Sequence, residues 1–352
     1  MKVEQITTPA LLVDLDAMES NLHRMAMFFV DKPCKLRPHF KNHKTPLLSW
    51  KQIRAGAIGM TCATMREAEI LVQHGIDSIL IANEIASDTK AELLADLSRH
   101  ASVIVAVDNS KTIRDLAMAQ RNRKAQIEIV VDINIGLNRC GVPPDQSVLD
   151  LARLAVGEGL KFRGVMGYDG HLQAVPQSPN RDELVRKGSK DLVDCAASIE
   201  SAGIPVSIVS TGGTGTHAVS GCYPGIMDIQ AGSYLLMDTM YLNRGASFRR
   251  SLTVLTTVIS TRDSEHAVLD CGVKAISCER GIPTLKDVPD AQIKELHAEH
   301  TLIEINRYSS LKFEVGQRLE LWVYYSDATV NLHSRLFGVR HGQVEDIFPI
   351  EH

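Results

Sequence analysis

The feature that most constrains the fold of this chain is a repeated alternation of apolar runs with helix-like segments between Lys35 and Tyr234. Most of the apolar runs are almost continuously apolar, as strands buried on both faces are. They are KLRPHF (35–40), IGMTCA (58–63), SILIAN (78–83), SVIVAV (102–107), IEIVVDI (127–133), FRGVMGY (162–168), VSIVS (206–210) and DIQAGSY (228–234). Segments with helical spacing, such as REAEILVQHG (66–75), lie between them. This α/β pattern of eight repeats predicts a closed (β/α)8 TIM-like barrel.

The pattern changes to alternating strands after about residue 245. The runs there are SLTVLTTVIS (251–260), HAVLD (266–270), TLIEI (301–305), RLELWVYY (318–325) and LFGVRHGQVEDIF (336–348). Alternation with turn signals between runs predicts an antiparallel β domain. We therefore expect a barrel over residues 1–245 and a C-terminal β domain over 246–352. Residues 1–14 precede the barrel repeats, so they are candidates for pairing with the β domain instead.

Two helices carry start signals in the sequence. Asp16 is predicted to cap the first, with Glu19 as its reciprocal partner. The second is predicted to begin after Thr64, with Glu67 in the reciprocal position, and to stop at Gly75.

Composition excludes several classes of function. The net charge is -4, and no basic cluster of the kind that binds nucleic acid is present. The longest apolar runs fall short of the ~18 residues of a membrane span, and the first residues do not resemble a secretory signal. None of the seven cysteines forms a Cys-x-x-Cys pair, which is typical of a reducing compartment. We expect a cytoplasmic protein that acts on a small molecule.

Polar residues follow several of the predicted barrel strands. Lys41 follows the first strand, Arg139 the fifth, and Tyr168 and His171 the sixth. Because the active site of such a barrel lies at the carboxyl ends of its strands, we expect these side chains to converge on one rim.

A glycine-rich segment, STGGTGT (210–216), follows the seventh strand. Gly213 and Gly215 would let the backbone approach an anion, and Thr211 and Thr214 add hydroxyl donors. Late barrel strands are where this fold commonly binds phosphate. The alternative is a tight loop without a ligand. The segment lacks the G-x-G-x-x-G pattern, so a dinucleotide is disfavoured.

Lys41 is a candidate for covalent cofactor attachment. Its neighbours His39, His43 and Lys44 would favour the uncharged amine that forms a Schiff base with an aldehyde. The alternative is a solvated or ion-paired lysine, which a phosphate loop on the same rim disfavours.

These segments together resemble the D-threonine aldolase and D-serine dehydratase family, which are pyridoxal-phosphate enzymes of the alanine-racemase fold. The matching segments are TPALLVDLDAMESNL (8–22), LRPHFKNHK (36–44), GLNRCGV (136–142), GYDGHLQ (167–173), STGGTGT (210–216), QAGSYLLMD (230–238), DCGVKAIS…RG (270–281) and DATVNLH (327–333). They cover nearly the whole chain in the family's order, and the resemblance also implies a homodimer.

The resemblance implies a role for each candidate residue. Lys41 would carry pyridoxal 5'-phosphate, Arg139 would lie by its phenolic oxygen, and Tyr168 would border its ring. His171 would face the substrate's β-substituent. The phosphate would be held by Thr211, Gly213, Thr214, Gly215, Gly232, Ser233 and Tyr234.

The chain departs from the family at its metal position. The family places a histidine two residues before an Asp or Cys ahead of the TVNL segment, whereas this chain has Tyr325 before Asp327. A neutral phenol is a poor ligand for Zn²⁺ or Mn²⁺. A divalent metal is therefore either weakly bound, through Asp327 and other groups, or not used.

The function expected from the resemblance is aldol cleavage of a D-β-hydroxy-α-amino acid, with His171 or Tyr325 as the base. The alternatives are a D-amino-acid dehydratase and an amino-acid racemase or epimerase, in which Lys41 and Tyr325 would be the two bases. A pyridoxal-phosphate carrier without catalytic activity is a further alternative. Such carriers are a barrel alone, so the β domain favours an enzyme.

Overall fold

The computed structural model describes residues 1–173 and 175–352, which divide into two compact units. The barrel unit comprises Arg24–Lys41 and Pro46–Gly232, and the β unit comprises Met1–His23, Asn42–Thr45 and Ser233–His352. Each unit is described by itself.

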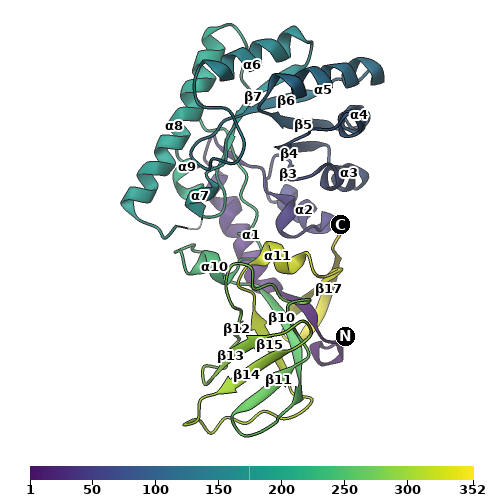
Figure 1. Cartoon of the computed structure of the whole chain (residues 1–352), viewed down its shortest axis with the longest axis vertical. Helices are drawn as coiled ribbons and strands as arrows, with labels where there is room; N and C mark the ends of the chain where they lie inside the picture. Colours follow the sequence, from purple (N-terminus) through teal and green to yellow (C-terminus); the bar gives the residue numbers. More distant parts are fainter. Residues whose placement is uncertain (174) are drawn as a thin grey trace. The chain divides into compact units, whose positions relative to one another are not determined.

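The barrel unit contains eight parallel strands in the order β2-β9-β8-β7-β6-β5-β4-β3 (Figure 1). A bridge between His39 and Thr61 joins the first and last of them, and the N–H of Ile58 donates to Leu36 O across the same seam at 2.9 Å. The strands are β2 (Lys35–Leu36), β3 (Met60–Cys62), β4 (Ser78–Glu84), β5 (Ser102–Val107), β6 (Glu128–Asp132), β7 (Lys161–Met166), β8 (Ile208–Thr211) and β9 (Asp228–Ile229). The predicted barrel is confirmed.

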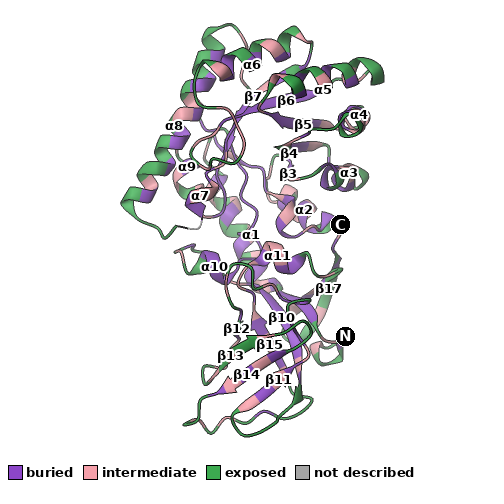
Figure 2. Cartoon of the chain, viewed as in Figure 1, coloured by how far each residue is buried: buried purple, intermediate pink, exposed green. Residues whose placement is uncertain are grey.

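Helices alternate with these strands and bury one face each (Figure 2). They are α2 (Pro46–Arg54), α3 (Met65–Gln73), α4 (Asp88–Leu97), α5 (Ser110–Arg123), α6 (Gln146–Gly157) and α8 (Pro179–Ser201), with the shorter η2 (Phe40–Asn42), α7 (Gly170–Gln173) and α9 (His217–Ser220). An apolar cluster is drawn from five neighbouring strands: Leu80, Ile104, Ala106, Val130, Met166 and Ile208. The nearly continuous apolar runs exist because such strands face apolar neighbours on both sides.

The β unit is built on a nine-stranded sheet. Its strands are β1 (Ala10–Asp14), β10 (Leu252–Ser260), β11 (His266–Leu269), β12 (Thr284–Leu285), β13 (Ala291–Leu296), β14 (Thr301–Ile305), β15 (Arg318–Trp322), β16 (Arg335–Arg340) and β17 (Gln343–Pro349). The pairs are antiparallel, as predicted, with one exception: β1 lies antiparallel to β10 but parallel to β16. The N-terminal strand is therefore part of this sheet.

Of the two predicted helix N-caps, the one at Thr64 is confirmed and the one at Asp16 is wrong. The Thr64 side chain accepts the N–H of Glu67 at 3.2 Å, and α3 begins after it as expected. The first helix, α1 (Leu15–Phe29), begins earlier than expected, because Asp14 Oδ1 accepts the N–H of Ala17 at 2.9 Å. Asp16 and Glu19 instead form ion pairs with Arg340.

The helices within the described ranges are all too short or too polar to cross a membrane.

Candidate active site

Lys41 stands at the carboxyl end of the first barrel strand, in the short helix η2. Its backbone N–H points to Nδ1 of His39 at 3.4 Å. The side chain is half-buried, and its Nζ lies 6.0 Å from the centroid of the Tyr168 ring. This is the distance of a cation–π contact.

Arg139 approaches the same aromatic ring. It lies in the loop after β6, and its guanidinium carbon is 5.8 Å from the Tyr168 centroid. Tyr168 itself follows β7. The barrel unit therefore brings Lys41, Arg139 and Tyr168 together, so that two cations border one aromatic ring. Such a group suits a ligand that is both planar and anionic.

His171 lies in α7 and packs against the loop after β6. A Cβ placed on Gly136 would lie 2.9 Å from both Cε1 and Nε2 of the imidazole. Gly136 also has a φ of +118°, which side chains rarely adopt. Nδ1 of His171 is buried and has no hydrogen-bond partner among the described residues. A buried polar nitrogen of this kind is suited to a ligand.

The glycine-rich loop uses several of its polar groups within the protein. The N–H of Gly213 donates to Thr216 Oγ1 at 3.1 Å, and the N–H of Gly215 donates to Gln173 Oε1 at 2.8 Å. The Thr211 hydroxyl donates to Gly167 O at 2.7 Å. The Gly213 and Gly215 amides therefore each have a partner within the protein, and phosphate binding by this loop stays a prediction.

The side chain of Gln173 forms hydrogen bonds with this loop. Its Nε2 donates to Asp169 Oδ1 at 2.7 Å and to Thr216 Oγ1 at 2.8 Å. A Cβ on Gly213 would lie 2.8 Å from Gln173 Oε1, so the loop can approach only without side chains. Burial raises the pKa of the Asp169 carboxyl, and hydrogen bonds from Thr216 and Gln173 oppose the shift.

Gln173 and Asp169 were not predicted as site residues, although both stand in the GYDGHLQ segment directly after a barrel strand. Their position directly after a barrel strand, in the same segment as Tyr168 and His171, was the signal that could have identified them.

The last three predicted phosphate residues fall in different units. Gly232 is the final residue of the barrel unit, whereas Ser233 and Tyr234 belong to the β unit. Tyr234 is fully buried there, and its ring centroid lies 5.7 Å from that of Phe248.

A second polar cluster lies in the β unit around α11 (Ser326–Val330). The Tyr325 hydroxyl lies 3.4 Å from Asp327 Oδ2. Asn42 Nδ2 donates to Asp327 Oδ1 at 2.7 Å and to Ser326 Oγ at 2.8 Å. Ser326 donates from its N–H and its hydroxyl to Asp238 Oδ2, at 2.9 and 2.8 Å. The predicted pair Tyr325 and Asp327 is thus held in a continuous network.

The electrostatics of this cluster keep the phenol protonated. Burial raises the pKa of Tyr325, the Asp327 charge raises it further, and the Arg280 guanidinium, 5.3 Å from the ring, opposes both. Burial also raises the pKa of Asp238 to about 6. The Tyr325 hydroxyl is therefore a proton donor at neutral pH.

The donor set around Asp327 does not fit a divalent metal. Both of its oxygens face hydrogen-bond donors, Asn42 Nδ2 and the Tyr325 hydroxyl. Nowhere in residues 1–173 and 175–352 do three or more His, Cys, Asp or Glu side chains gather as metal ligands.

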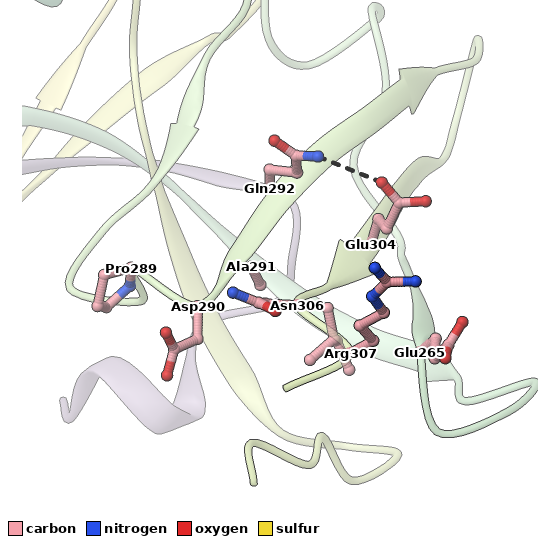
Figure 3. A pocket seen from close by; sticks show the side chains of 9 residues that line it. Glu265, Pro289, Asp290, Ala291, Gln292, Glu304, Asn306 and Arg307 are labelled. Carbon is pink, nitrogen blue, oxygen red and sulfur yellow. Dashed lines mark hydrogen bonds between the residues drawn. The ribbon is translucent and has the colours of Figure 1, made fainter. Parts of the chain in front are cut away.

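The β unit also contains a hollow of about 390 Å³ beside β13 and β14 (Figure 3). Two of the three carboxylates that line it have partners: Glu304 accepts from Gln292 and Lys294, and Asp290 accepts from Ser309. None of the predicted site residues lines it, and we assign it no chemistry.

The profile of the alanine racemase N-terminal domain matches residues 13–237, and that of a serine dehydratase domain matches 251–339. A D-threonine aldolase of Arthrobacter sp. is 34% identical over 98% of this chain and 92% of its own length. A 3-hydroxy-D-aspartate aldolase of Paracoccus denitrificans (strain Pd 1222) is 31% identical over 99% and 93%. The crystal structure of D-threonine aldolase from Filomicrobium marinum superposes with a TM-score of 0.96 at 34% identity, covering 99% of this chain and 96% of that one.

Proposed function

Because this chain belongs to the alanine-racemase-fold family of D-threonine aldolases and D-serine dehydratases, we propose that it cleaves the Cα–Cβ bond of a D-β-hydroxy-α-amino acid. The products are a smaller amino acid and an aldehyde. The chain is an enzyme of the lyase type. The observation that carries the proposal is the convergence of Lys41 and Arg139 on the Tyr168 ring at the carboxyl ends of the strands.

The residues of the barrel unit fit pyridoxal 5'-phosphate. The two cations by Tyr168 and the buried Nδ1 of His171, which has no partner among the described residues, suit a planar anionic ligand. Lys41 would hold it covalently and Arg139 would lie by its phenolic oxygen. The phosphate would be held by the loop residues Thr211, Gly213, Thr214 and Gly215 with Gly232, Ser233 and Tyr234. When bound, this cofactor supplies an acceptor for the electron pair of the broken bond.

The protein's own task in this reaction is to move a proton at the substrate's β-oxygen. A base takes the hydroxyl proton, the C–O bond becomes a carbonyl, and the Cα–Cβ electrons remain with the amino-acid fragment. We assign the base to His171, because its Nδ1 is a buried nitrogen without a partner in the described part of the chain. Tyr325 is assigned the complementary role of proton donor, because its phenol stays protonated. Positioned groups of this kind accelerate proton transfer by about 10²–10⁴-fold.

No step of the proposed reaction uses a divalent metal, because the donor set at Tyr325 and Asp327 does not fit one. The β-hydroxyl is instead oriented by hydrogen bonds.

A dehydratase is the second candidate, favoured by the match of residues 251–339 to a serine dehydratase domain. It differs in the fate of the β-oxygen, which leaves as water after protonation. We further propose a cytoplasmic homodimer. The seven cysteines, all of them free, and the family resemblance support this.

The test is product analysis with a panel of D- and L-β-hydroxy amino acids, with and without chelator. We expect glycine and acetaldehyde from D-threonine, none from L-threonine, and little loss in chelator. A keto acid with ammonia as the main product identifies the dehydratase instead. Interconversion of enantiomers without cleavage contradicts both. Activity that is lost in chelator and restored by Mn²⁺ contradicts the metal-free assignment.

A further inference from the structure

Three carboxylates that the proposed reaction does not use lie at the ends of consecutive barrel strands. Glu84 ends β4, Asp108 follows β5, and Asp132 ends β6. The parallel register pairs Glu84 with Ala106 and Val107 with Val131, so all three lie at the same edge of the sheet. The loop that carries Arg139 begins directly after β6.

Two of these carboxylates have oxygens that are buried without a donor in the described part of the chain. Asp132 is 8% exposed, and its Oδ1 has no hydrogen-bond partner among the described residues. Glu84 Oε1 is also buried and has no hydrogen-bond partner among the described residues. The two carboxyl groups are within hydrogen-bonding reach of each other. Two ionised carboxylates cannot donate to each other, whereas a pair that holds one proton can form a hydrogen bond.

The surroundings favour a retained proton. Burial is the main cause that raises the pKa of Asp132, to about 8, and the charges of Glu84 and Asp108 add to it. Arg139 opposes the shift. Burial and the Glu84 carboxylate also raise the pKa of the Cys140 thiol, which hydrogen-bonds to Glu84. Asp108, Arg139 and Cys140 are charged or titratable groups, among the described residues, that act on the pair.

Two of these residues hold the end of the loop over residues 133–142, Asp132 through its backbone carbonyl and Asp108 through its carboxylate. The N–H of Val142 donates to Asp132 O at 3.0 Å, and the N–H of Gly141 donates to Asp108 Oδ2 at 3.3 Å. The N–H of Asn134 closes the loop on Val142 O at 2.8 Å. Arg139 lies two residues before Gly141, so a shift of the Asp108 carboxylate acts on the loop that carries Arg139.

We propose that Glu84 and Asp132 share one proton and serve as a positioning pair for Arg139. With one proton the pair carries a single negative charge, which balances Arg139 while the guanidinium remains by Tyr168. When the proton leaves, the two carboxylates repel each other and Asp108, and the second charge draws Arg139 toward them. The part of the proposal that concerns the cofactor rests on the proposed function, in which Arg139 contacts the ligand.

Infrared spectroscopy of the full-length protein tests the shared proton without any assay of activity. The difference spectrum between wild type and Asp132→Asn at pH 7 should contain the C=O band of a protonated carboxylic acid. In wild type that band should fall with a midpoint near pH 8. Asp108→Asn is the matched control and should keep the band. Absence of the band from wild type at pH 7 overturns the proposal.

The pH dependence of thermal stability provides a second test of the shared proton. The folded pKa of Asp132 is raised from its ordinary 3.8 to about 8, so its contribution to stability is full below about pH 4 and is lost as the pH rises to about 8. The amide introduced by Asp132→Asn cannot ionise but can donate to Glu84. The Tm of Asp132→Asn relative to wild type should therefore rise from about pH 4 to about pH 8, and an unchanged difference contradicts the proposal.

The absorption spectrum of the bound cofactor provides the readout for Arg139. In wild type it should change with a midpoint near pH 8, and Asp132→Asn should abolish that change. If the protein binds no cofactor, the proposed function fails while the infrared test still decides on the shared proton. A cofactor-loaded variant that keeps the wild-type pH dependence contradicts the positioning role.

Discussion

Tyr325 and Asp327 form a hydrogen-bonded pair at the start of α11, and each affects the chemistry of the other. The carboxylate and the burial of the phenol together raise the tyrosine pKa. The phenol in turn lies 3.4 Å from one oxygen of Asp327, while Asn42 donates to the other. In the proposed reaction this protonated phenol would donate to the substrate.

Substitutions of Tyr325 separate these two properties. Tyr325→Phe should lower turnover by about 10²–10⁴-fold, the usual contribution of a positioned proton donor, and leave cofactor retention unchanged. Tyr325→His replaces the phenol with an imidazole beside Asp327 and should raise the stoichiometry of bound Mn²⁺ or Zn²⁺. Steady-state kinetics and elemental analysis are the measurements, with the exposed Tyr308→Phe as control. Full activity in Tyr325→Phe would show that the hydroxyl has no part in the reaction.

The start of α1 shows what residue-level signals leave undecided. Asp14 and Asp16 both suit a cap, and their spacing does not distinguish them. The choice depends on where β1 ends, which is set by its pairing with β10, as between Val13 and Leu252. That pairing joins residues far apart in the chain. The cap at Thr64 was predictable because its partner Glu67 lies in the same turn.

At the scale of elements, the glycine-rich loop and α7 form one hydrogen-bonded assembly. Gln173 joins them, since it accepts from Gly215 and donates to Thr216 and Asp169. The glycines permit this contact, because a Cβ on Gly213 or Gly215 would lie within 3.0 Å of Gln173. The sequence indicated a loop for close approach, but not that a protein side chain makes the approach.

A methyl group on Gly213 tests this reading of the loop. Its Cβ would lie 2.8 Å from Gln173 Oε1, and Gln173 is buried and hydrogen-bonded on both sides. We expect Gly213→Ala to lower the free energy of unfolding by roughly 1–3 kcal/mol and to weaken cofactor retention after dialysis. Gly157→Ala is the control, because a Cβ there meets nothing within 4 Å. Equal retention in both variants would remove the loop from the binding site.

Site residues could be predicted from the sequence where strand order decides their position. They could not be predicted where contacts between distant segments decide it. Lys41, Arg139 and Tyr168 stand after barrel strands, and the fold carries such positions to one rim. Asp169, Gln173, Glu84 and Asp132 also stand near strand ends. Their importance comes from burial and from hydrogen bonds between distant segments, which a pattern of residue types does not contain.

At the scale of the whole molecule, the chain passes between the two units four times. One excursion is very short: Asn42–Thr45 belongs to the β unit, and it begins directly after Lys41. The first strand also joins the β unit, through β10 and β16. The apolar pattern predicted both folds, and the position of residues 1–14 before the barrel repeats pointed to their pairing with the β domain. The segment Asn42–Thr45 could not be assigned in this way, since so short a segment has no period of its own.

Above all, we propose that Lys41 carries the cofactor. Borohydride treatment of the purified protein reduces a lysine–pyridoxal linkage to a stable secondary amine, which peptide mass spectrometry locates. We predict a single label on Lys41 and none in Lys41→Arg. A label on Lys44, whose ammonium donates to Asn331 at 2.6 Å, or a protein that takes up no label, would contradict the assignment of Lys41.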